Sequence, residues 1–257
     1  IVFEGGKPQI QDGAFMGVSP RALIEISEND TSFEESIDGI PIQTTNNPLN
    51  FIVQNGCVYL VSSSEAVVVG FDGDIDTQLI IPDNINGSPV TEIRSGAFQS
   101  SPLESVHIPD SVIKIGENAF RNCSNLSNVR LPSNCELGWF CFNGTSSLKE
   151  IEIPEGVEDI GVYTFGNSGL ETITLSEGVK NIYGQAFEGC RALEKIVFPS
   201  SIEFIGNKAF NNCGKLASIV FEGGKPQIQD GAFMGVSPRA LIEISENDTS
   251  FEESIDG

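Results

Sequence analysis

Few residues of this chain could carry out chemistry. His107 is the only histidine, so nucleophilic catalysis by a Ser-His or Cys-His pair would depend on it. It stands between Val106 and Ile108 in an alternating segment, so we expect it to face outward on a strand, and no nucleophile has a regular spacing to it. Carboxylates are abundant, but a regular repeat offers no deep cleft for acid-base work by a glycosidase pair. The sequence therefore predicts a protein that is not an enzyme and has no catalytic residues.

A calcium-like spacing of acidic residues occurs once. Asp72, Asp74 and Asp76 alternate as the oxygen ligands of a calcium loop do. Thr77, however, stands where an EF-hand needs glycine, and Asp83 stands where it needs a bidentate glutamate. The chain also lacks a Cys-x-x-Cys pair of the kind that binds zinc. We therefore predict no metal and no cofactor.

The six cysteines point to a structural role. Three of them recur at one position of a short repeat, where other turns carry Thr145 or Ser168, so a small residue suffices there. We predict buried free thiols that fill the core, with disulfides as the alternative, because the count is even and secretion is expected. The cysteines are Cys57, Cys123, Cys135, Cys141, Cys190 and Cys213.

Six asparagines lie in Asn-x-Ser/Thr motifs and are the candidate sites for N-glycosylation. In a eukaryotic protein they would be expected to carry surface glycans on turn tips, whereas in a bacterial protein the motifs would have no such meaning. The candidates are Asn29, Asn86, Asn122, Asn125, Asn143 and Asn247.

A long repeat organises the chain. Residues 1–39 recur without a change as residues 219–257, which gives a period of 219 − 1 = 218 residues. We interpret this as a window from a tandem array of near-identical modules, with an artificial duplication as the alternative. Residues 1–39 are then the C-terminal end of a preceding identical module. Residues 40–50, with two prolines and a polar cluster, are predicted to be a linker, and residues 51–257 one complete module.

A shorter repeat runs through that module. The phenylalanines that end each Ala-Phe pair or its variant are spaced by 22 or 23 residues, and a set of leucines keeps the same step. In one turn, the alternation of Val106 and Ile108 predicts a short strand, which Pro109 ends, and Val112 and Ile115 supply a second apolar edge. Because one such turn cannot bury its own apolar face, the turns must stack. The phenylalanines, predicted to form an interior stack, are Phe98, Phe120, Phe142, Phe165, Phe187, Phe210 and Phe233.

The pattern in residues 103–123, which recurs in residues 193–213, strongly resembles the BspA-like (Treponema-type) leucine-rich repeats. The resemblance implies a β-rich solenoid, a right-handed coil of 22–23-residue turns with a parallel sheet on one face. It also implies a secreted or surface protein, with adhesive roles in many members, and it supplies no catalytic motif. We expect seven turns, with residues 51–93 as the opening or cap segment, 94–240 as repeat turns and 241–257 as the closing segment.

One turn departs from the pattern. The turn that contains Trp139 is one residue short before Gly138, so we expect a local bulge near Trp139. The tryptophan stands where other turns have Glu117 or Asn207, so it is expected to be exposed. Such a side chain could contact a sugar or a protein, although adaptation of the shortened turn is the favoured interpretation.

Charge restricts the partners. With 36 acidic and 14 basic residues the formal net charge is -22, which disfavours nucleic acid and anionic membrane surfaces, and no apolar run is long enough to span a bilayer. The predicted role is a structural module of an extracellular filament, fibre or surface layer, with neighbouring copies bound head-to-tail. The alternative is a cell-surface adhesin that binds a host protein or glycan through the solenoid face. The outward strand positions predict no aromatic stripe, which favours the structural role.

Overall fold

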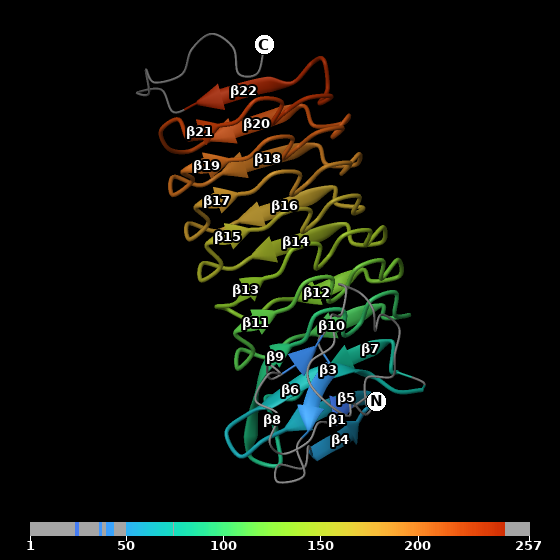
Figure 1. The fold of residues 1–257 in the computed structure, drawn as a ribbon. Coiled ribbons are helices and arrows are strands. Elements are labelled where there is room, and N and C mark those ends of the chain that lie inside the picture. The colour runs from blue at the N-terminus through green and yellow to red at the C-terminus, as the bar shows by residue number, and fades with distance from the viewer. Residues whose placement is uncertain (1–23, 26–35, 38–39, 44–49, 74, 245–257) are drawn as a thin grey trace.

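A computed structural model describes residues 24–25, 36–37, 40–43, 50–73 and 75–244. These residues form a β-solenoid built from short strands and turns (Figure 1), which confirms the predicted leucine-rich-repeat coil. Within those ranges we find no helix of the length and apolarity needed to cross a membrane.

Eight strands follow one another along one face. Paired strands are parallel and in register, for example Val106 opposite Val129. The predicted alternation is present, because Val106 is buried whereas His107 is partly exposed. This ladder has eight strands, one more than the seven turns expected. The additional strand is formed by residues 78–80, which were expected to belong to the opening segment. The strands are β7 (Gln78–Ile80), β10 (Ser105–His107), β12 (Asn128–Arg130), β14 (Glu150–Ile153), β16 (Thr172–Leu175), β18 (Lys195–Phe198), β20 (Ser218–Phe221) and β22 (Leu241–Ile244).

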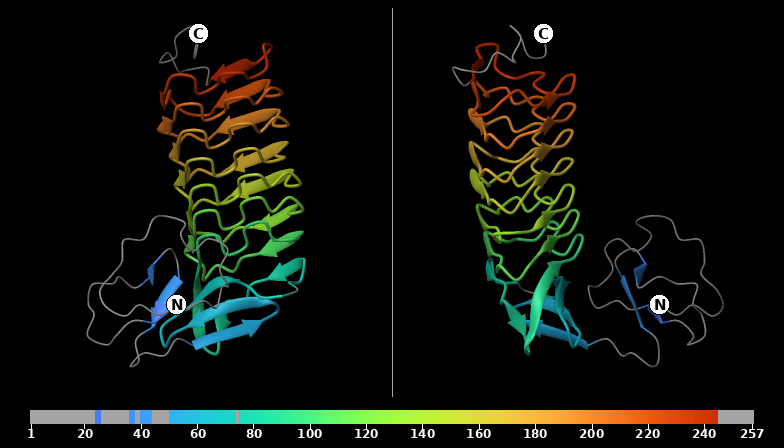
Figure 2. Two further views of the ribbon diagram at one scale, coloured as in Figure 1. Left: turned by 45° about the vertical axis from the view of Figure 1, so that its right-hand side comes forward. Right: turned by 90° about the vertical axis from the view of Figure 1, so that its left-hand side faces the viewer.

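A second ladder of shorter parallel strands lies on the opposite face (Figure 2). Most of its strands are only two residues long, with one residue buried, as at Ile115, Ile160 and Ile182. Each turn therefore closes its core between one strand of each ladder. The strands are β9 (Ser88–Ile93), β11 (Lys114–Ile115), β13 (Glu136–Leu137), β15 (Asp159–Ile160), β17 (Asn181–Ile182), β19 (Phe204–Ile205) and β21 (Gln227–Ile228).

The opening end of the solenoid is closed by antiparallel strands. Strand β9 pairs in parallel with β6 (Ala66–Phe71), which continues antiparallel to β5 (Cys57–Val61) and β4 (Asn50–Gln54). Strand β8 (Asn84–Ile85) adds a hairpin to β9. The β4–β5 hairpin turns on Asn55 and Gly56, whose φ angles are 51° and 76°, as the two-residue turns favoured by Asn-Gly require.

Among the described residues of the first 43, three further strands are present. Strand β3 (Ile40–Gln43) pairs in parallel with β1 (Ile24–Glu25) and antiparallel with β2 (Ser36–Ile37). The predicted linker, residues 40–50, therefore begins with a strand, and β4 starts at its last residue. Most of residues 1–39 lies outside the described part of the chain, so their assignment to a preceding module stays a prediction.

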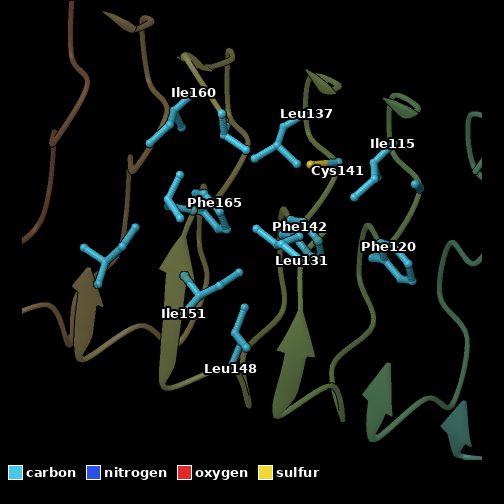
Figure 3. Packing of buried hydrophobic residues seen from close by; sticks show 14 of the residues in the cluster. Ile115, Phe120, Leu131, Leu137, Cys141, Phe142, Leu148, Ile151, Ile160 and Phe165 are labelled. Carbon is cyan, nitrogen blue, oxygen red and sulfur yellow. The ribbon is translucent and has the colours of Figure 1, made fainter. Parts of the chain in front are cut away.

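The predicted phenylalanine stack is confirmed. The seven rings are buried and lie one above another, with successive centroids 5.0–5.6 Å apart and ring planes within 13° of parallel. Figure 3 shows Phe120, Phe142 and Phe165 in this stack, surrounded by aliphatic side chains. Since one ring comes from each turn, every turn contributes core surface to both of its neighbours.

The six cysteines are buried free thiols, as predicted. The Sγ atoms of Cys123, Cys190 and Cys213 donate to the carbonyl oxygen of a stacked phenylalanine in the preceding turn, at 3.0–3.2 Å. At the same repeat position, the Thr145 hydroxyl donates to the Phe142 carbonyl at 2.8 Å. Most turns therefore carry a small side chain with a donor group at this position, although the last turn has Val236 there, which has no donor.

The predicted bulge near Trp139 is wrong. Strand β13 pairs with β11 without a register shift, and the amide of Gly138 donates to the Ile115 carbonyl at 2.7 Å. Since β12 is also in register with β10, the missing residue is absorbed in the corner 131–135. The irregularity lies instead in the strand pairing between this turn and the next. In the longer ladder β12 is not paired with β14, and in the shorter ladder β13 is not paired with β15.

Close stacking of the turns explains a recurrent glycine. A Cβ atom on Gly206 would lie 2.5 Å from the backbone nitrogen of Gly184 in the preceding turn. We expect Gly206→Ala to lower the free energy of unfolding by about 1–3 kcal/mol, because the backbone must shift to admit the methyl group. Gly214→Ala, in the same turn, is the control, since a Cβ atom there meets nothing within 4 Å. Equal urea midpoints for the two variants would contradict this account.

Candidate functional surfaces

The outward face of the longer strands is polar and mixed in charge. His107 lies here, as predicted, with its Nε2 atom 2.8 Å from Nη1 of Arg130 on the next strand. Neighbouring exposed positions carry Asn128, Glu150 and Thr172, and no aromatic stripe runs through the predicted outward set. This face therefore has the composition of a solvated sheet surface.

Two exposed carboxylates are held in their charged form. The backbone N–H of Ser133 donates to Asp110 at 2.8 Å and lowers the pKa of that carboxyl group. Hydrogen bonds from Ser200 likewise lower the pKa of Glu177. A general acid needs the opposite shift, so neither carboxylate is prepared for acid catalysis. Asp74, of the calcium-like run, lies outside the described residues, and within those described no cluster of three or more His, Cys, Asp or Glu residues could hold a metal ion.

The candidate glycosylation sites differ in exposure. Asn86, in the β8–β9 hairpin, is exposed, as are Asn122 and Asn125. The expectation of an exposed turn tip is wrong for Asn143, which is only 8% exposed because its amide packs beside Gly166 of the next turn. Asn29 and Asn247 lie outside the described residues, and modification of any site stays a prediction.

Five aromatic side chains lie in or beside the shorter strands, and we call this set the aromatic surface. Its members are Trp139, Phe140, Tyr163, Tyr183 and Phe204. The rings of Phe140 and Tyr163 stack 5.0 Å apart, and those of Tyr183 and Phe204 lie 6.0 Å apart. Trp139 is 53% exposed, as expected, and its indole lies over Gly161, which is aligned with Tyr183 of the next turn. The indole thus both packs on its neighbour and presents a free face.

Two members of the aromatic surface adopt the left-handed backbone conformation. The φ angles of Phe140 and Tyr163 are 59° and 54°, a region in which a bulky residue costs about 1–2 kcal/mol. The guanidinium of Arg121 lies 5.3 Å from the Phe140 ring centroid, and Tyr163 accepts a hydrogen bond from Gln185. Stacking and cation–π contact offset part of this cost.

Sequence reasoning singled out Trp139 but missed the rest of the aromatic surface. A signal was available in the repeat register. Gly96 and Gly231 occupy the same left-handed position as Phe140 and Tyr163 in other turns, with φ angles of 68° and 72°. The remaining turns place Asn118, Gln185 and Lys208 there, with φ angles of 57°, 62° and 58°, so the position is left-handed in every turn and is not reserved for glycine. A bulky aromatic side chain in this conformation is costly, and that cost marks the surface as a feature to explain.

The closing end of the described solenoid is open. Strand β22 pairs with β20 on one side, with Ile242 opposite Ile219 and Ile244 opposite Phe221. Ile219 and Phe221 are buried, whereas Ile242 and Ile244 are 41% and 38% exposed. The last rung therefore continues the inward columns of the core but leaves them uncovered.

Comparisons with known proteins agree with this geometry. The family described as BspA type leucine rich repeat region matches residues 91–137 and 135–255, with six copies of the repeat. A leucine rich cell surface protein from Faecalibacterium prausnitzii is 26% identical over 70% of this chain, with a TM-score of 0.52. A leucine-rich repeat protein from Eubacterium ventriosum, 21% identical over 91% of this chain (TM-score 0.53), and one from T. pallidum, 21% identical over 78% (TM-score 0.52), share the fold.

The chain matches only part of the length of each of these proteins. The chain spans 56% of the F. prausnitzii protein, 62% of the E. ventriosum protein and 84% of the T. pallidum protein. No curated protein is detectably similar to the chain.

Proposed function

This chain belongs to the BspA type leucine-rich-repeat family, and from that premise we propose that it is a structural module of an extracellular filament, fibre or surface layer. The modules would repeat every 218 residues and contact one another head-to-tail. A surface location is supported by the F. prausnitzii relative, which is described as a cell surface protein. A role without catalysis is supported by the solvated sheet face and by the lowered pKa values of Asp110 and Glu177.

The single observation that carries the proposal is the identity of residues 1–39 with residues 219–257. If the modules recur with unchanged junctions, then every junction presents the same pair of surfaces. Such heterologous contacts generate open fibres unless the rotation between neighbours closes a ring. A filament is therefore the natural product of the array.

Electron microscopy of a chain carrying two consecutive modules tests the proposal. We expect one fixed angle and one fixed axial distance between the modules, because identical surfaces meet at each junction. Freely varying angles, as in beads joined by a loose linker through residues 40–50, would refute the filament.

A second candidate function, a surface adhesin, is favoured by the aromatic surface. Exposed aromatic rings with polar neighbours suit contact with a sugar or with a protein, and Trp139 presents half of its surface to solvent. The sequence predicts that the adhesin binds through the sheet of longer strands. The aromatic surface instead favours the face formed by the shorter strands.

Glycan-array binding separates the two candidates. If the adhesin proposal is right, one module binds a defined glycan saturably, and Trp139→Ala weakens the affinity by about 10-fold or more, as expected for an aromatic anchor. Met234→Ala is the control, because Met234 is similarly exposed (50%) but lies outside the aromatic surface. Absence of saturable binding, or equal loss in both variants, removes the adhesin and leaves the structural role.

A further inference from the structure

Strand β22, whose second edge has no partner strand among the described residues, has a copy near the start of the chain. Residues 24–25 and 242–243 are the same Ile-Glu pair of the 39-residue repeat, since 24 + 218 = 242. In the first copy, strand β1 pairs in parallel with β3, with Ile24 opposite Ile42 and Glu25 opposite Gln43. The first copy therefore shows which strand this sequence accepts as a parallel partner.

The strand that follows completes a hairpin. Strand β2 pairs antiparallel with β3, with Ile37 opposite Ile40, so only Asp38 and Gly39 lie between the paired residues. Asp-Gly is among the sequences that favour a two-residue hairpin turn.

The opening end of the solenoid provides the precedent. There the parallel ladder runs from β9 to β6 and then closes with the antiparallel strands β5 and β4, which turn on Asn55 and Gly56. The order β1-β3-β2 is similar, with one parallel partner followed by one antiparallel strand where the opening end has two. Both arrangements end a ladder with a hairpin, which leaves a single short edge.

We propose that the β22 edge binds a strand with the sequence of Ile40–Gln43, supplied by the junction that follows a second copy of residues 1–39, and that this strand caps the closing end of each module. Directly paired residues of a parallel ladder project to the same face, so the inward column of Ile196, Ile219 and Ile242 would gain one further isoleucine. The proposal rests on the tandem array of the proposed function. Under this proposal each module ends at Gln43 of the repeat, and no longer at Gly39, so the linker between modules begins after Gln43.

The exposure of apolar side chains on β22 supports pairing with the apolar strand Ile40–Gln43. Ile242 and Ile244 are the inward residues of the last rung, and Leu241 on the outer side is 68% exposed. An uncovered strand edge with apolar side chains invites uncontrolled pairing, so a covalently adjacent partner is an effective protection. The acidic net charge of -22 adds repulsion between chains, which further favours a partner supplied by the same chain.

A C-terminal extension of the full chain tests the cap. The variant carries a copy of residues 40–50 directly after Gly257, and its matched control carries the same extension with Ile42→Asp in the added copy. We expect amide hydrogen exchange in Leu241–Ile244 to slow by about tenfold or more in the extended chain, with a higher midpoint of thermal unfolding, because a new ladder covers the edge. The Asp-bearing control should exchange at the rate of the unextended chain.

Either of two results overturns the proposal. One is unchanged exchange at Leu241–Ile244 in the extended chain, and the other is equal protection by the extension and by its Asp-bearing control. The measurement concerns one chain alone, so it is separable from the filament. A protected edge with freely varying module angles would leave the cap in place and remove the filament, whereas an unprotected edge with fixed angles would do the reverse.

Discussion

Replacing Phe187 with alanine is expected to lower the free energy of unfolding by about 3–5 kcal/mol, the range found for large core truncations. The ring is fully buried between Phe165 and Phe210, with centroid distances of 5.4 Å and 5.0 Å. Its removal would leave a cavity that touches both neighbouring turns, and the stacked rings on either side are held by their own rungs. The site therefore has little freedom to collapse, which places it toward the upper part of that range.

The matched control lies four residues away in the same turn. Tyr183 is 39% exposed, and its ring lies 6.0 Å from that of Phe204 at a tilt of 55°, so we expect Tyr183→Ala to cost about 1 kcal/mol. Urea unfolding followed by circular dichroism gives both values, provided that the slope with urea stays unchanged. A cost for Phe187→Ala no larger than that for Tyr183→Ala would show that the ring stack does not carry the stability of the solenoid.

The repeat itself could be predicted because the same chemical constraint recurs in every turn. A ring in the stack must contact the rings above and below it, so phenylalanine returns every 22 or 23 residues and reveals the period. Alternation around Val106 then fixes which strand residues face inward, and the structure follows it. Local pattern and tertiary packing agree at these positions, so sequence reasoning is sufficient there.

Other features depend on contacts between turns, which a single period does not reveal. Asn143 looks like a turn-tip residue, yet the next turn covers it at Gly166. The shortened turn keeps its register at β13 because the corner 131–135 takes up the missing residue. In the aromatic surface, Phe140 and Tyr163 adopt the left-handed backbone that Gly96 and Gly231 have in other turns, and the sequence reveals this only when the turns are aligned residue by residue.

The second large effect concerns alkaline pH. Burial raises the pKa of Cys190 from an ordinary 9.0 to about 11, and those of Cys57 and Cys135 to about 12. Burial also raises the pKa values of Cys123, Cys141 and Cys213. Above the ordinary pKa the unfolded chain releases thiol protons that the folded chain retains. The stabilisation is therefore fully present below pH 9 and is lost as the pH rises toward the raised values.

Each retained proton lowers the free energy of unfolding by about 1.4 kcal/mol per pH unit in that window, so six thiols together are expected to cause steep alkaline unfolding. Urea unfolding under reducing conditions, repeated in small steps from neutral pH to the alkaline side of the thiol window, measures the slope. Lysine and tyrosine titration and the net charge of -22 also act at high pH, so the slope alone does not identify the thiols.

Serine substitution isolates the thiol contribution, because the solenoid already uses hydroxyl groups at this repeat position. The Thr145 hydroxyl donates to the Phe142 carbonyl of its own turn, whereas the thiols donate to a phenylalanine carbonyl of the preceding turn. A triple variant with Cys123→Ser, Cys190→Ser and Cys213→Ser keeps a donor at each position and removes the titrating protons. Its stability at neutral pH is expected to fall modestly, since serine is more polar than cysteine. At alkaline pH, the slope of its unfolding free energy against pH should correspond to about three fewer protons released on unfolding, one for each removed thiol. If the triple variant keeps the full slope of the parent chain, the buried thiols are not what limits stability at high pH, and repulsion among the exposed carboxylates would then be the stronger explanation.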